Sequence, residues 1–224
     1  MSRKLKIGWV PVLLWILGGV TVLSGLVRFA ITGHALATGV PPADPAGIVY
    51  VQHPWLAASH ILPGIAFMLI GPLQFIPSIR LHWPKMHRIS GRIFIVCGVL
   101  AAVTALGVEF VFPLRGGHVK RAAIVVFSCA LIVSLALAWR HAVQRRIDAH
   151  RAWVIRGYAI GLALSTTRLY FLPTYFIFGN PGTLAAGLVT WTGFCVNILV
   201  AEWIVRRLRR GRRAPAPQLE ASGA

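Results

Sequence analysis

The stretch HPWLAASHILPGIAFMLIGPLQFIPSIRLHWPKMHRISGR, residues 53–92, decides how the rest of the chain is interpreted. It contains an apolar run with a histidine, His60, near its start and a glutamine, Gln74, near its end. A basic turn that bears histidines follows, and then the next apolar run begins. A helix needs about 20 apolar residues to cross the hydrocarbon core of a bilayer. The pattern therefore predicts a transmembrane hairpin with polar groups at both ends of the membrane.

Similar apolar runs occur throughout the 224 residues, of which 57% are hydrophobic and 12% charged. Six spans are expected, at about residues 7–31, 54–77, 89–112, 122–139, 153–172 and 183–205. They predict an all-α, polytopic integral membrane protein, a bundle of six transmembrane helices. The first run exceeds the roughly 7–15 residues of a signal peptide's apolar region, so we expect a retained helix rather than a cleaved signal.

The charge distribution predicts the orientation. The chain has 23 Lys and Arg against five Asp and Glu, a formal charge of +18, and the basic residues gather at the N-terminus and after the second, fourth and sixth spans. Positive segments stay on the cytoplasmic side, so both termini are expected there, although the connection after the third span also holds Arg115, Lys120 and Arg121. We expect a multi-pass protein of the bacterial inner (plasma) membrane that contacts anionic lipid headgroups and, lacking a soluble domain, binds no nucleic acid.

Three regions are expected on this basis. Residues 1–50 would form the first helix and a proline- and glycine-rich loop on the periplasmic or extracellular side. Residues 51–206 would form a five-helix membrane core. Residues 207–224 would be a basic, disordered cytoplasmic tail.

In three spans the polar residues share one helical face with small residues, within about 40° of a histidine at about 100° per residue. These stripes are His60, Gly64, Gly71 and Gln74 in the second span, His87, Gly91, Gly98, Ala105 and Glu109 in the third, and His150, Gly157, Gly161 and Arg168 in the fifth. Small residues let membrane helices approach closely, and ionisable groups face the bundle interior. The second, third and fifth spans should therefore meet along these stripes.

The topology sorts the polar groups into two layers. The outer layer would contain His60, Glu109 and Arg168, and the inner layer Gln74, His87 and His150. We expect Glu109 and Arg168 to form an ion pair, because a lone charge at that depth is costly.

Two residues of the sixth span complete the expected polar network. Asn197 is expected to hydrogen-bond across helices. Glu202 is expected to pair with the neighbouring Arg206 and Arg207.

Several motifs along the chain resemble those of one family, the uncharacterised bacterial membrane proteins grouped as domain of unknown function 2306. They are HILPG at 60–64, GPLQF at 71–75, HRISGR at 87–92, HRAWVIR at 150–156, Arg168 and WTGFCVNILVAE at 191–202. The resemblance covers roughly residues 50–205 and departs at Ile155, where the family has methionine. It implies a multi-helix membrane protein and brings no established activity with it.

The preferred functional hypothesis is a redox protein with b-type haem or a quinone in the seam between the second, third and fifth spans. His87 and His150 would ligate the haem iron, with Arg88, Arg92, Arg151 or Arg156 at the propionates. A second haem in the outer layer would have only His60 as a ligand. The plainer interpretation is that each histidine hydrogen-bonds a backbone carbonyl or a lipid phosphate.

Two other functions stay open. The polar layers would suit a small proton or solute transporter, because intramembrane ionisable residues mark such routes. They would equally suit a non-catalytic membrane scaffold. Neither an HExxH nor a GxSxG motif occurs, so no catalytic residue is assigned, and no metal ligand is expected apart from His87 and His150 for haem iron.

Overall fold

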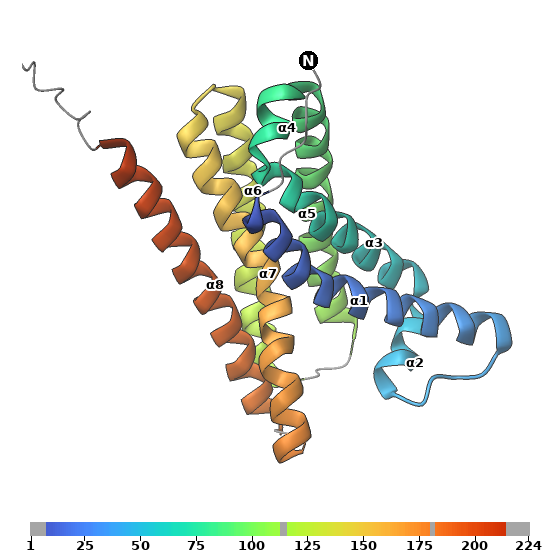
Figure 1. Ribbon diagram of the computed structural model, residues 1–224. Coiled ribbons are helices and arrows are strands. Elements are labelled where there is room, and N and C mark those ends of the chain that lie inside the picture. Colours follow the sequence, from blue (N-terminus) through green and yellow to red (C-terminus); the bar gives the residue numbers. More distant parts are fainter. Residues whose placement is uncertain (1–7, 113–115, 180–181, 214–224) are drawn as a thin grey trace, which may run out of the picture.

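The computed structural model describes residues 8–112, 116–179 and 182–213, which are almost entirely helical (Figure 1). In chain order the elements are α1 (Trp9–Thr38), α2 (Pro45–Gln52), α3 (Pro54–Ile70), the 3-10 helix η1 (Gly71–Phe75), α4 (Pro77–His82), α5 (Pro84–Val111), α6 (Gly117–Val143), α7 (Ile147–Phe178) and α8 (Gly182–Arg213). No strand occurs within these described segments, and the all-α prediction is confirmed.

Five of the predicted spans lie in helical segments that are long and apolar enough to cross a bilayer. Within the described residues these segments are α1, α3 with η1, α5, α6 and α8. The sixth predicted span lies in α7, which is 32 residues long but carries Arg156 and Arg168 among its apolar residues. The structure thus confirms a multi-helix membrane protein, and the count of six spans stays a prediction.

The helices extend beyond the apolar windows predicted from the sequence. α5 begins at Pro84 rather than near residue 89, and α7 begins at Ile147 rather than near residue 153. α8 continues to Arg213, so the prediction of disorder from residue 207 is wrong for 207–213, and the rest of the tail lies outside the described residues. Apolar windows locate the hydrocarbon core, whereas a helix continues into the interface where polar side chains are hydrated.

The decisive hairpin contains a break that the apolar pattern did not predict. α3 ends at Ile70, the chain tightens into η1, and the expected basic turn forms the short helix α4. Pro72 has no backbone N–H to continue the helical ladder. The ring of Tyr158 occupies the space that a Cβ on Gly71 would fill, so this turn lies directly against α7.

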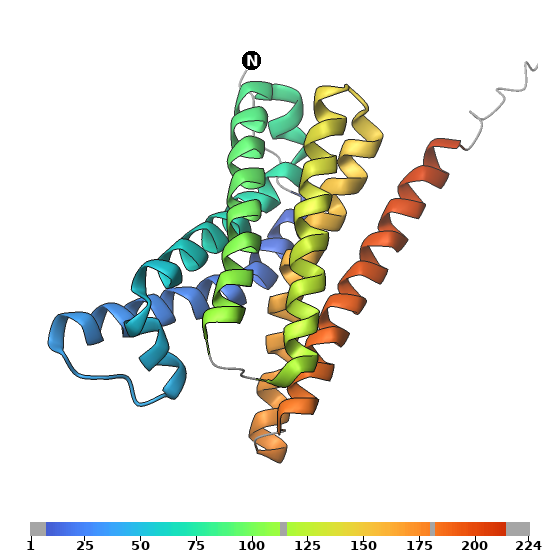
Figure 2. The same cartoon turned by 180° about the vertical axis from the view of Figure 1, so that it is seen from behind.

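The helices are arranged with α5, α6 and α7 side by side, while α1 and α3 cross this group obliquely (Figure 1). The basic segments around α4, between α6 and α7 and at the end of α8 lie toward one end of the bundle, and α2 lies toward the other (Figure 1). The C-terminal half of α8 leans away from the other helices in both views (Figures 1 and 2). The shared end fits the predicted orientation, which itself stays a prediction.

The centre of the bundle is an aromatic cluster around Phe67. Its ring stacks on Phe94 with centroids 4.6 Å apart and lies 5.7 Å from the ring of Tyr158. Gly98 and Gly161 leave room for the Phe67 ring, which a Cβ at either position would clash with. α3 packs directly on α5, whereas α7 packs on α6 and α8 and reaches α3 through these rings. The small-residue stripes of α3, α5 and α7 therefore meet around the Phe67 ring. α3 contacts α5 directly, whereas aromatic rings lie between α3 and α7.

Candidate functional site

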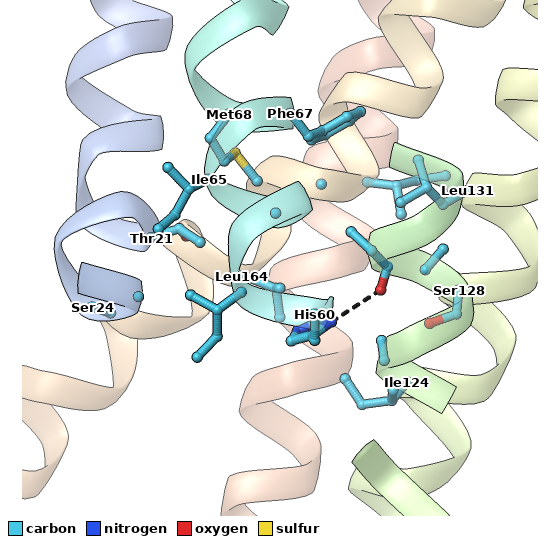
Figure 3. Close-up of a pocket in the computed structure, with 18 of the residues that line it drawn as sticks. Thr21, Ser24, His60, Ile65, Phe67, Met68, Ile124, Ser128, Leu131 and Leu164 are labelled. Atoms are coloured by element: carbon cyan, nitrogen blue, oxygen red, sulfur yellow. Dashed lines mark hydrogen bonds between the residues drawn. The ribbon is translucent and has the colours of Figure 1, made fainter. Parts of the chain in front are cut away.

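A cavity of about 370 Å³ lies inside the bundle, and all the long helices contribute to it. Its walls are mainly apolar and include the rings of Phe67, Phe127 and Phe194. The lining residues with polar side chains are Thr21, Ser24, Arg28, Tyr50, His60, Ser128 and Arg168. Figure 3 shows Phe67 and Met68 on one side of this space and His60 and Ser128 on the other. The part of the cavity around Phe67 is thus apolar, whereas both polar and apolar side chains line the part around His60, where Ile124 and Leu164 also lie.

His60 of α3 is fixed at the cavity by α5. Its Nδ1 lies 3.0 Å from the carbonyl oxygen of Ala101, the bond drawn in Figure 3, and 3.3 Å from Oγ1 of Thr104. A carbonyl oxygen can only accept, so Nδ1 carries the ring proton. Nε2 is then the nitrogen that remains as an acceptor for a molecule in the cavity.

Arg168 of α7 is the second ionisable residue of the predicted outer layer that lines the cavity. Its Nη1 donates to Oγ1 of Thr21 at 3.3 Å and to the carbonyl oxygen of Leu164 at 3.1 Å. Thr21 is in turn 2.7 Å from Oγ of Ser165, so α1 and α7 share a small hydrogen-bonded group. His60 and Arg168 are brought to one cavity, as the outer layer predicted.

Glu109 does not belong to that group, and the expected ion pair with Arg168 is wrong. Oε1 of Glu109 lies 3.8 Å from Nε of Arg121, and Nη2 of Arg121 donates to the Glu109 carbonyl oxygen at 2.9 Å. Glu109 stands near the end of α5 and Arg121 near the start of α6, so the short connection brings them together. Arg121 is twelve residues from Glu109 and lies on the next helix. Helical spacing compares residues of one helix, so it does not identify such a partner.

In the inner layer, Gln74 forms a hydrogen bond with α5, the helix that carries His87. Its Nε2 donates to Oγ of Ser90 on α5 at 2.9 Å, and that hydroxyl lies 3.3 Å from the carbonyl oxygen of His87. Gln74 is buried and belongs to η1 rather than to α3. The side chain therefore connects the break in the hairpin to the start of α5.

The two inner histidines lie near the starts of α5 and α7. Nδ1 of His150 donates to the carbonyl oxygen of Ala138 at 2.8 Å, which leaves Nε2 as its acceptor. Nδ1 of His87 is buried and has no hydrogen-bond partner among the described residues. The plainer expectation of a carbonyl partner thus holds for the His150 ring.

The arginines expected around the inner layer separate into two groups. Arg156 forms a two-point ion pair with Glu202 of α8, with nitrogen–oxygen distances of 2.5 and 3.1 Å, and lies over the ring of Trp153. The expected pairing of Glu202 with its own neighbours is therefore corrected, because α7 supplies the partner. Arg88 and Arg92 are exposed, and Arg151 is half-buried.

Asn197 makes the interhelical hydrogen bond that was expected. Its Nδ2 donates to Oγ1 of Thr166 on α7 at 2.8 Å and to the carbonyl oxygen of Gly193 in its own helix. This contact lies between α7 and α8 and does not line the cavity. It is a packing contact that confirms the prediction.

The sequence analysis missed the contribution of the N-terminal region, which it separated from the membrane core. Thr21, Ser24 and Arg28 of α1 and Tyr50 of α2 all line the cavity. Nη1 of Arg28 donates to both carboxylate oxygens of Asp44, at 3.1 Å each, and the guanidinium lies over the ring of Tyr50. The signal was Arg28 itself, a charged residue inside the first apolar run, which predicts an inward-facing side chain.

Comparison with known protein families identifies one match. The model of the family described as "Predicted membrane protein (DUF2306)" matches residues 57–205, which include His60, Gln74, His87, His150, Arg168 and Glu202. No curated protein and no solved structure matches the chain.

Proposed function

The chain belongs to that family of predicted membrane proteins, and from this premise we propose that it binds a small amphipathic molecule of the membrane in the cavity. The observation that carries the proposal is the composition of the cavity. Aromatic and aliphatic walls adjoin His60 and Arg168 within one space of about 370 Å³. Ligand pockets are typically about 300–1,000 Å³, largely apolar, with a few placed polar groups.

The polar groups favour a ligand site over a structural network. Structural polar groups in a membrane bundle hydrogen-bond one another, as Asn197 and Thr166 do. Arg168 uses only Nη1 in its recorded bonds, and His60 uses only Nδ1. Several hydrogen-bonding positions are thus directed to no protein partner in the described part of the chain, and a molecule with a polar head would use them.

A quinone is one molecule of this class and links the cavity to the redox hypothesis. Its ring would lie among the phenylalanines, with its oxygens toward His60 and Arg168. We place the protein in the plasma membrane of a bacterial cell, with the basic end of the bundle in the cytoplasm, because positively charged segments are retained on that side.

Gly64 offers a direct test. It lines the cavity, and a Cβ at this position would meet no heavy atom within 4 Å, so the Gly64→Leu side chain would fill the space without disturbing the helix. Gly19 of α1 is the matched control, since its Cβ position is equally open and it does not line the cavity. The measurement is mass spectrometry of small molecules extracted from protein purified from its membranes.

Wild-type protein and Gly19→Leu should carry the same amphipathic molecule in similar amounts. Gly64→Leu should carry at least about tenfold less, because the space is occupied. Equal amounts in all three proteins, or none in any of them, would contradict the proposal.

A second candidate function is b-type haem binding at the inner layer, favoured by the unpartnered Nδ1 of His87. Bound haem would supply one-electron transfer, and the imidazoles of His87 and His150 would hold it, with Ala138 fixing the His150 ring. Arg88 and Arg92, which are exposed, stay candidates for the propionates, as does Arg151, whereas the guanidinium of Arg156 forms an ion pair with Glu202.

The reduced-minus-oxidised visible spectrum tests this second candidate. Haem-supplied protein should show haem bands that His87→Ala and His150→Ala each abolish. Folded protein without bands would exclude the haem and leave the cavity proposal intact.

A further inference from the structure

We propose that the head group of the molecule in the cavity carries a single negative charge, as a carboxylate does, and that Arg168 holds it. This inference rests on the proposed function and specifies the class of ligand. A fatty acid is the simplest molecule with this chemistry, whereas a quinone head is neutral.

The acidic residues of the described segments are all committed elsewhere or too far from Arg168. Asp44 pairs with Arg28, Glu109 with Arg121 and Glu202 with Arg156. Asp148 lies in the first turn of α7, twenty residues before Arg168, which corresponds to about 30 Å along the helix. The guanidinium of Arg168 therefore has no carboxylate partner in the part of the chain that the structure describes.

Neither hydrogen-bond partner of Arg168 among the described residues carries a charge that would compensate the guanidinium. Its partners are a threonine hydroxyl and a backbone carbonyl, both neutral and both on Nη1. The other arginine at the cavity, Arg28, is balanced by Asp44 at two distances of 3.1 Å. Of the two arginines that line the cavity, Arg168 is thus the one without a carboxylate partner in the described segments, and it leaves a positive charge uncompensated.

A charge inside a membrane bundle is normally paired or hydrated, because an unpaired one is costly. Nε and Nη2 of Arg168 form no hydrogen bond with the described residues, since both of its hydrogen bonds come from Nη1. Nε and Nη2 form the edge of a guanidinium that can bind a carboxylate through two parallel hydrogen bonds. A monoanion neutralises the cavity. A neutral head leaves the charge in place, and a dianion introduces a charge of the opposite sign.

The remainder of the cavity suits a single hydrocarbon tail. Phe67, Met68 and Leu131 line its apolar part, and Figure 3 shows them away from His60. An acyl chain would bury its surface against these side chains at no polar cost. The charge of Arg168 and the apolar wall of the cavity thus favour the same class of ligand, a carboxylate with one hydrocarbon chain.

Photocrosslinking measures the head-group preference. Full-length protein in phosphatidylcholine nanodiscs is labelled with a dodecanoic acid that bears a diazirine, and dodecanoic acid, dodecanol and decylubiquinone compete with it. Dodecanoic acid should compete about 10- to 100-fold better than the two neutral molecules, as expected for charge-assisted hydrogen bonds in a site of low polarity.

Variants of Arg168 assign the preference to this side chain. Arg168→Gln should remove it and Arg168→Lys, which keeps the charge, should retain most of it. Arg140→Gln is the control: Arg140 is an exposed arginine of α6 that does not line the cavity, so its substitution should leave the preference unchanged.

The outcomes separate the inference from the proposed function. Equal competition by acid, alcohol and quinone, all sensitive to Gly64→Leu, would overturn the anionic head group and leave the ligand cavity standing. An acid preference that survives Arg168→Gln would overturn the role of Arg168. Absence of any competable labelling at the cavity in wild-type protein would overturn both.

Discussion

The two polar layers of the bundle differ in how their charges are satisfied. At the basic end, Arg156 has Glu202, and Gln74 has Ser90. At the cavity, the hydrogen-bond partners of Arg168 within the described part of the chain are neutral, and an open space lies beside it. Polar groups that are satisfied by one another stabilise a bundle, whereas polar groups left facing a cavity are expected where a ligand completes them. Apart from the buried Nδ1 of His87, the groups at the basic end are therefore mainly structural, and the cavity is where function should first be sought.

The largest effect on stability should come from the ion pair between α7 and α8. Arg156→Leu leaves the Glu202 carboxylate without its partner, and the side chains are only 19% and 32% exposed. We expect a loss of about 1.5–3 kcal/mol, which corresponds to a fall in the unfolding temperature of roughly 3–12 °C. Thermal unfolding in detergent measures it.

The double variant Arg156→Leu with Glu202→Leu is the control for this prediction. Removing both charges should recover much of the lost stability, because no unpaired charge remains. A double variant as unstable as the single one would show that the ion pair is not the cause.

A smaller loss is expected from the hydrogen bond that joins η1 to α5. Gln74→Leu keeps the approximate side-chain volume and removes the donor to Ser90, which should lower stability by about 1 kcal/mol. The unfolding temperature of Gln74→Leu/Ser90→Ala should equal that of Gln74→Leu alone. A further large loss in the double variant would contradict the pairing.

The smallest effect on stability is expected at the cavity, and it should be a gain and not a loss. Arg168→Leu removes an uncompensated charge, so ligand-free protein should be as stable as wild type or more stable by up to about 1 kcal/mol, roughly 2–4 °C in unfolding temperature. The same substitution should abolish stabilisation by added dodecanoic acid. A clear loss of stability in the ligand-free variant would mean that Arg168 is structural.

The sequence predicted which polar residues face the bundle interior better than it predicted their ion-pair partners. Helical spacing correctly placed His60 and Arg168 on inward faces, because a face follows from periodicity alone. It wrongly joined Glu109 to Arg168, since periodicity does not say which neighbouring helix supplies the partner. The contribution of α1 was missed because Arg28 was counted within an apolar run, and its pairing with Asp44 depends on how the following loop folds back.

The hydropathy pattern also did not predict the end of α3 at Ile70. Gly71 and Pro72 mark it in the sequence, but only the position of Tyr158 explains why the turn has to lie so close to α7. Tyr158 also donates its hydroxyl to the carbonyl oxygen of Met68, at 3.1 Å, near the end of α3. Such long-range contacts are set by tertiary packing rather than by local sequence.

The most direct test of the account is an experimental structure of the protein crystallised from lipid with dodecanoic acid. The account predicts electron density in the cavity, with the carboxylate at Arg168 and the chain along Phe67 and Met68. A cavity filled by side chains, or an Arg168 paired with an acidic residue of the protein, would contradict it.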